Sequence, residues 1–207
     1  MIATKNVRFS YPNIDFLFPD LRCQAGETLL ITGKSGTGKT TLLHILSGIL
    51  KPESGNVQIG ETNIETLSDK HLDAFRGQNI GLVLQQSHFI ASLSVLENIV
   101  LASWLSDKSK KTEKAKDLLK QLGLESQMHK NISQLSIGQQ QRASIARALI
   151  NEPKVLLADE PTSSLDDENA EIVADLLSNL SKQYKASLII VTHDQRLKDK
   201  FESVVEL

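Results

Sequence analysis

A glycine-rich octapeptide, Gly33-Lys34-Ser35-Gly36-Thr37-Gly38-Lys39-Thr40, is the feature that most constrains the fold of this chain. It matches G-x-x-x-x-G-K-[ST] and stands between a predicted buried strand, Glu27–Thr32, and a predicted helix, Thr40–Leu50. The glycines let the backbone curl so that successive N–H groups point inward, and the following helix adds its positive N-terminal end. The sequence therefore predicts a phosphate-binding loop in an α/β fold.

Two side chains of this loop have defined chemistry. Lys39 can reach the β- and γ-phosphates of a nucleotide, and the Thr40 hydroxyl is a hard oxygen ligand suited to Mg²⁺. The alternative, a tight turn with an exposed lysine, is disfavoured by the strand–loop–helix setting. We expect the phosphates to be held by Gly33, Ser35, Gly36, Thr37, Gly38, Lys39, Thr40 and Thr41.

A second apolar strand, predicted over Lys154–Ala158, runs into two acids, Asp159 and Glu160. In folds with a phosphate loop, ligands bind beyond the carboxyl ends of the strands. Asp159 can there hold Mg²⁺ through its water shell, and Glu160 can polarise an attacking water as a general base. Two such acids taken alone are more often solvated turn residues, and it is the phosphate loop that favours the catalytic interpretation.

A third element is the predicted helix that opens at Leu135-Ser136-Ile137-Gly138-Gln139. Ser136 is a plausible N-cap, and an apolar stripe supplies the buried face. By itself this segment is no more than a capped helix with a polar first turn.

In this order the three elements resemble the ATP-binding subunit of ABC transporters, and the resemblance covers essentially the whole chain. The family signature corresponds to Ser136-Ile137-Gly138-Gln139. The resemblance implies ATP and Mg²⁺ as cofactors and a second copy of the chain as partner. In such a dimer Ser136, Gly138 and Gln139 contact the nucleotide of the other copy. The segment Pro161–Asp166 resembles the loop that crosses the dimer interface.

Smaller family motifs also find matches. The resemblance implies that Tyr11 stacks on adenine, that Gln85 senses Mg²⁺ and the attacking water, and that His193 contacts the γ-phosphate. From the residues alone, Tyr11 could equally be an aromatic at a β-bulge, and His193 a structural histidine. Gln86 competes with Gln85, which is preferred because it ends an apolar strand directly.

One signature position departs from the family pattern, since Ile137 stands where the family usually has glycine. A β-branched residue resists positive φ, so we expect altered local packing with activity retained.

A narrower resemblance rests on fewer residues. Leu67-Ser68-Asp69, Leu72 to Arg76, and Ile80-Gly81 leading into Gln85 resemble the bacterial ATPases of lipoprotein release, macrolide efflux and cell division. That subgroup implies an integral membrane, permease-like partner with few membrane helices and a large extracytoplasmic part.

Composition sets further limits. With 40% hydrophobic and 23% charged residues the chain is ordinary for a globular protein, and its net charge of −2 gives no reason to expect nucleic-acid binding. A single cysteine, no signal peptide and no long apolar run favour a cytoplasmic location. The family resemblance implies a peripheral position on the inner face of the cell membrane.

Together these features predict an α/β fold: a P-loop NTPase core with a mostly parallel sheet, an N-terminal antiparallel β subdomain and a helical subdomain insertion. We expect one domain over 1–207, with the core and β subdomain at about 1–91 and 151–207 and the helical subdomain at about 92–150. The expected function is an ATPase that couples dimer closure and hydrolysis to a membrane partner, for export, lipoprotein extraction or mechanical signalling. The alternative is a soluble, non-transport ABC-type ATPase.

Overall fold

A parallel sheet of five strands forms the centre of the molecule, in a computed structural model that describes residues 1–207. Its strands lie in the order β10-β4-β9-β8-β7, and every neighbouring pair is parallel. This order brings together segments that are far apart in the sequence: β4 (Thr28–Thr32), β7 (Ile80–Val83), β8 (Val155–Asp159), β9 (Ser187–Val191) and β10 (Val204–Glu206).

Both faces of this sheet are buried, which explains why its strands read as continuous apolar runs. On β8, Val155 and Leu157 belong to one hydrophobic core, and Leu156 and Ala158 belong to another on the opposite face. The alternation follows from the period of two along a strand.

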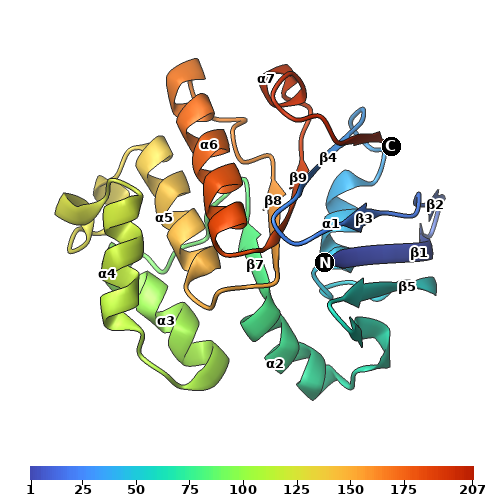
Figure 1. Ribbon diagram of the computed structural model, residues 1–207, viewed down its shortest axis with the longest axis horizontal. Coiled ribbons are helices and arrows are strands. Elements are labelled where there is room, and N and C mark those ends of the chain that lie inside the picture. Colours follow the sequence, from blue (N-terminus) through green and yellow to red (C-terminus); the bar gives the residue numbers. More distant parts are fainter.

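A second, antiparallel sheet covers one side of the molecule (Figure 1). Helix α1 (Lys39–Leu46) buries Leu42, Leu43, Ile45 and Leu46 in the 18-residue core that it shares with this sheet and the parallel sheet. The strand order is β2-β1-β5-β6, with β3 added on β1; the strands are β1 (Ile2–Tyr11), β2 (Ile14–Leu17), β3 (Arg22–Cys23), β5 (Ser54–Ile59) and β6 (Thr62–Asn63).

Helices cover the other face of the parallel sheet around a core of 27 buried residues. In Figure 1, α5 and α6 lie next to the sheet and α3 and α4 lie beyond them. Their bounds are α3 (Val95–Asp107), α4 (Thr112–Gln121), α5 (Ile137–Leu149) and α6 (Asp167–Gln183). The remaining helices are α2 (Asp69–Asn79), α7 (Gln195–Lys198) and short 3₁₀ turns at Ile64–Thr66, Glu125–Gln127 and Ile132–Gln134.

The predicted fold class is confirmed, with two local differences. Helix α2 was not predicted, because none of its residues is fully buried and its apolar pattern is weak. Helix α1 ends at Leu46 rather than at residue 50, because Gly48 adopts a left-handed φ of 68° that closes the helix. The division into a helical part at 92–150 and a core stays a prediction.

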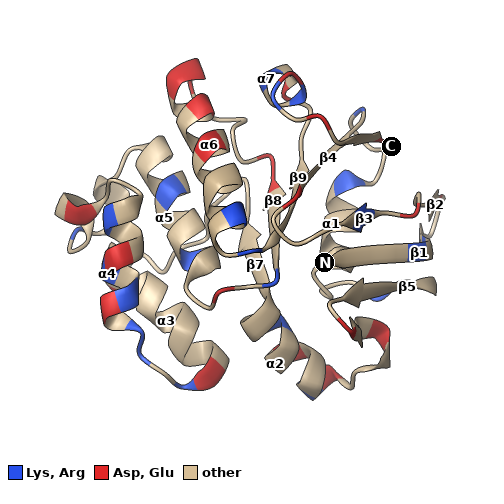
Figure 2. Cartoon of the chain, viewed as in Figure 1, with Lys and Arg blue, Asp and Glu red and all other residues tan.

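Charges of both signs are spread over the surface (Figure 2). Neighbouring carboxylates pair with three lysines of the basic run 108–116: Lys111, Lys114 and Lys116. Lys111 pairs with Asp107 at 3.1 Å, and Lys114 pairs with Glu152 at 2.8 Å. None of the helices has the length and apolar character that crossing a membrane would require.

Candidate functional site

The phosphate-binding loop is built from positions that only glycine can occupy. Gly38, the N-cap of α1, has a φ of 92°, and a Cβ there would lie 2.7 Å from the ring of Phe16. A Cβ at Gly33 would lie 2.7 Å from the carbonyl oxygen of Leu207. At Gly36, with φ of 85°, nothing lies within 4 Å of such a Cβ. The loop therefore packs on β2 at Gly38 and on Leu207 at Gly33, and there is open space beside Gly36.

Lys39 folds back across this loop. Its ammonium group donates hydrogen bonds to the carbonyl oxygens of Gly33 and Lys34, each at 2.9 Å. Helix α1 begins at the same residue, so its free N–H groups and positive end point into the loop. The cation and the amides together suit a chain of phosphate groups.

Asp159 ends β8 opposite the start of α1. Its Oδ2 lies 3.4 Å from the Thr40 hydroxyl. Burial raises the pKa of the Asp159 carboxyl above its ordinary value of 3.8, and repulsion from the neighbouring Glu160 raises it further. The cleft thus holds two hard oxygen donors, one of them a carboxylate, a donor set that suits Mg²⁺.

Glu160 is held in a fixed position by the segment that follows β9. Its carboxylate accepts hydrogen bonds from the Thr192 hydroxyl at 2.8 Å and the His193 backbone N–H at 3.2 Å, and it lies 2.6 Å from His193 Nδ1. The Glu160 side chain is 13% exposed and that of His193 71%. Glu160 also adopts a left-handed φ of 46°, anchored by its N–H donating to the Val191 carbonyl.

The loop after Glu160 is tied to the same segment by a charged cluster. Asp194 accepts hydrogen bonds from the Thr162 hydroxyl and from Arg196, both at 2.7 Å. These contacts lower the pKa of Asp194 to about 2. Arg196 also donates to Asp167 at the start of α6. The segment Pro161–Asp166 is therefore fixed at both ends.

One cleft of about 710 Å³ collects most of the predicted site. Twelve of the predicted residues line it: Tyr11, Gly33, Ser35, Gly36, Gly38, Lys39, Thr40, Thr41, Gln85, Asp159, Glu160 and His193. Thr37 does not line it and instead donates to the Lys34 carbonyl at 3.0 Å. Gln85 lines the cleft and Gln86 does not.

The cleft also contains residues that the sequence did not single out as site residues. Ile14, Phe16 and Lys34 line it, and Thr192 supports Glu160 from behind. Tyr11 and Phe16 meet edge to face at 6.3 Å between ring centroids, and Phe16 stacks on Phe18 at 5.6 Å. The alternation of Phe16, in β2, with Phe18, just after it, was a sequence signal that could have pointed to this part of the cleft.

Ser136, Gly138 and Gln139 lie outside this cleft, at the start of α5. Ser136 caps the helix, since its hydroxyl accepts from the Gln139 N–H at 3.3 Å, while Gln139 Oε1 accepts from the Ser136 N–H at 3.0 Å. Gly138 is buried against Asn169 of α6, whose Oδ1 would lie 2.9 Å from a Cβ.

The expected strain at Ile137 does not occur. Ile137 is the first residue of α5, its φ is not positive, and its side chain is 60% exposed. A β-branched residue is tolerated in this helical conformation, so the expectation of altered packing through positive φ was wrong.

Comparisons with known proteins agree with this geometry. Residues 19–163 match the model of the family described as ABC transporter. The chain belongs to this family. It is 40% identical over 189 residues to the lipoprotein-releasing system ATP-binding protein LolD of Buchnera aphidicola subsp. Schizaphis graminum, covering 90% of this chain and 82% of that protein. It is also 40% identical over 193 residues to LolD of Cytophaga hutchinsonii, covering 92% of this chain and 88% of that protein.

Solved structures extend the comparison to the whole fold. A dimeric post-hydrolysis state of the ATP-binding cassette MJ0796, bound to ADP and Pi, matches with a TM-score of 0.88 and 33% identity, over 100% of this chain and 94% of that one. The chain is an ATP-binding ATPase subunit of the ABC transporter family, and the soluble, non-transport alternative is not supported.

The raised pKa of Asp159 predicts that its ionised carboxylate lowers the stability of the folded chain when no ligand is bound. A carboxyl whose folded pKa is raised above 3.8 binds its proton more tightly in the folded state, so stability is lost as pH rises through that window. Asp159→Asn removes the charge and should raise the unfolding temperature of the chain at pH 7 without nucleotide or Mg²⁺. The gain should shrink as pH falls toward 4.

The measurement is thermal unfolding followed by circular dichroism over that pH range. Asp117→Asn, at an exposed carboxylate on α4, is the control and should change little. A lower unfolding temperature for Asp159→Asn at pH 7 would contradict this account of the cleft.

Proposed function

We propose that two copies of this chain close around two ATP molecules and that this cycle drives an integral membrane partner in a complex of the lipoprotein-release type. The observation that carries the proposal is the separation of the signature from the chain's own phosphate cleft. Ser136, Gly138 and Gln139 do not line the cleft that holds Lys39 and Glu160. A complete site therefore takes its signature from a second copy.

Within each site the residues have distinct roles. Lys39 and the loop amides hold the phosphates, and Tyr11 stacks on adenine. Thr40, Asp159 and Gln85 supply oxygen ligands for Mg²⁺, which when bound neutralises phosphate charge. Support comes from the 3.4 Å approach of the Thr40 and Asp159 oxygens and from the presence of Gln85 in the same cleft.

Glu160 activates the attacking water as general base, and His193 contacts the γ-phosphate. The support is their fixed geometry: a 2.6 Å contact between His193 Nδ1 and the Glu160 carboxylate, with Thr192 holding the second carboxylate oxygen. A base that is already oriented needs little reorganisation when substrate binds.

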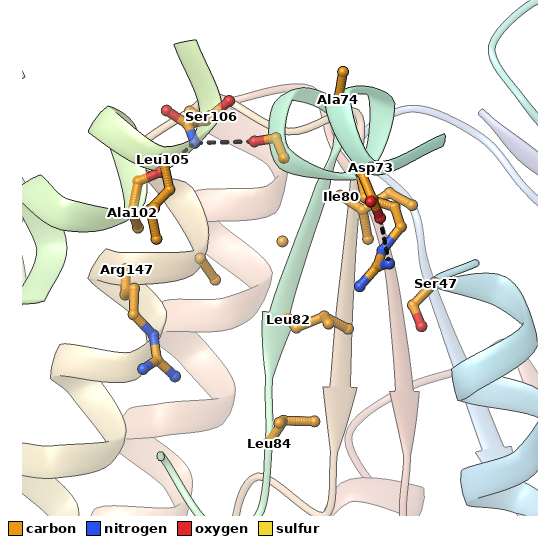
Figure 3. A pocket seen from close by; sticks show the side chains of 15 residues that line it. Ser47, Asp73, Ala74, Ile80, Leu82, Leu84, Ala102, Leu105, Ser106 and Arg147 are labelled. Carbon is orange, nitrogen blue, oxygen red and sulfur yellow. Dashed lines mark hydrogen bonds and ion pairs between the residues drawn. The ribbon is translucent and has the colours of Figure 1, made fainter. Parts of the chain in front are cut away.

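A second cleft, of about 820 Å³, supports the proposal that the chain binds a membrane partner (Figure 3). It lies between α2, β7, α3 and α5, and Leu84 of its lining directly precedes Gln85. Its rim carries Leu105, which is 62% exposed. We assign this groove to a segment of the permease-like subunit. A segment bound here would contact Leu84, which directly precedes Gln85 of the ATP cleft.

The relatives support a proposal for the cargo and the place of action. The LolD proteins are named for a lipoprotein-releasing system. We infer that this chain serves the same class of membrane complex, docked peripherally on the inner face of the cell membrane.

The general-base role predicts the behaviour of Glu160→Gln. The amide keeps the shape but cannot take a proton, so ATP binding should persist while hydrolysis falls by roughly 100-fold or more. Phosphate release and fluorescent ATP titration measure the two effects, with Glu171→Gln on α6 as control. Turnover within a few-fold of wild type would assign water activation to another residue.

The dimer predicts a dependence on both ATP and the signature. Because the γ-phosphate is contacted by Ser136 and Gly138 of the second copy, Glu160→Gln with Mg-ATP should be a dimer and with ADP a monomer. Adding Ser136→Arg places a bulky cation at the contact and should abolish dimers. Light scattering decides between the states. Equal dimerisation with Ser136→Arg would refute the assigned signature contact.

The groove predicts a separable defect in partner binding. Leu105→Asp places a charge on the exposed rim and should prevent co-purification of membrane subunits with the tagged chain from detergent extracts, while basal ATPase activity is kept. Ile172→Asp, at a 39% exposed site on α6, is the matched control and should co-purify normally. Retention by Leu105→Asp would place the docking surface elsewhere.

A further inference from the structure

The segment 85–93, which links β7 to α3, is attached to only one side of the molecule. Every hydrogen bond that it makes with other segments goes to α3 or α5. Gln85 itself makes no hydrogen bond to the chain. Its side chain is therefore positioned by the end of β7 on one side and by the attachments that begin at Ser87 on the other.

Arg147 of α5 is the strongest of these attachments. Its guanidinium donates to the carbonyl oxygens of Ser87 at 2.7 Å and His88 at 2.9 Å, and it lies 4.5 Å from the ring centroid of Phe89. His88 has a left-handed φ of 35°, a conformation that a non-glycine residue keeps only when its surroundings hold it. One side chain thus fixes three consecutive residues.

Arg147 is held by backbone carbonyls and an aromatic ring. No carboxylate pairs with it, and burial lowers its pKa. A cation without an acidic partner is costly to bury. The planar guanidinium of Arg147 instead donates to two backbone carbonyls. Arg196 and Arg76 pair with carboxylates. Arg147 differs from them in that its side-chain hydrogen bonds all go to backbone carbonyls.

Asn98 of α3 completes the attachment at the far end of the segment. Its side chain accepts from the Ile90 N–H at 2.9 Å and donates to the carbonyls of Ile90 and Leu93. The Arg147 contact, however, falls on Ser87, which lies two residues from Gln85 along the chain, and Arg147 also lines the 820 Å³ cleft. Arg147 therefore links α5 directly to the backbone that follows Gln85.

We propose that Arg147 is a positioning residue for ATP hydrolysis, which holds Gln85 at the attacking water by fixing the backbone of Ser87 and His88. The proposal rests on the role assigned above to Gln85. Arg147 does not line the 710 Å³ cleft, so we expect its substitution to lower turnover and to leave ATP affinity unchanged.

The first test separates positioning from packing. Arg147→Ala should lower kcat by about 10- to 100-fold, the cost of moving a positioned group by about 1 Å, with KM for ATP within about twofold. Arg147→Lys, which keeps the charge but loses the fork, should give an intermediate kcat. Lys114→Ala removes another half-buried cation that faces an aromatic ring, Tyr184 at 5.9 Å, and should lower stability but not kcat.

The deciding test is a double-mutant cycle with Gln85→Ala, using Arg147→Lys if Arg147→Ala fails to fold. If Arg147 acts through Gln85, its substitution should cost less than twofold further in the Gln85→Ala background. Equal, multiplicative losses in both backgrounds, or an unchanged kcat for both Arg147 variants, would overturn the proposal. A Gln85→Ala variant with full activity would instead refute the role of Gln85 itself.

Discussion

Parallel pairing of β4, β7, β8 and β9 is the constraint on which the site depends. Four segments that are distant in the sequence end at one edge of the sheet, because parallel strands bring their carboxyl ends together. After β4 comes the phosphate loop, after β8 Glu160, after β9 His193 and after β7 Gln85. The apolar alternation that buries both sheet faces is thus also what assembles the chemistry.

Much of this arrangement could be predicted because it depends on local rules. The glycine spacing of the phosphate loop, the acids that follow β8 and the capping of α5 at Ser136 all act within a few residues. Where the prediction failed, the missing information was tertiary. No residue of helix α2 is fully buried, and its Leu72 and Phe75 are only partly buried against the core. Thr192 supports Glu160 only because β8 and β9 are neighbours.

The expectation for Ile137 shows how a family pattern can mislead when it is read as backbone geometry. A glycine in a signature suggests a need for positive φ, yet this position is the first turn of a helix. The closer packing is at Gly138, where a Cβ would lie 2.9 Å from Asn169 Oδ1 and that side chain would have to shift to admit it. Steric demand at the α5–α6 contact, and not backbone freedom, limits the residue type there.

Several strained groups, and groups without an oppositely charged partner, lie at the ATP cleft or between it and the groove. Asp159 carries a raised pKa, Glu160 and His88 have left-handed backbones, and Arg147 is a cation without an acid. Each costs free energy in the isolated chain, and each lies at the ATP cleft or between it and the groove. A core optimised only for stability would replace them. Their persistence is what is expected if ATP with Mg²⁺, a second copy and a membrane partner supply the missing interactions during the cycle.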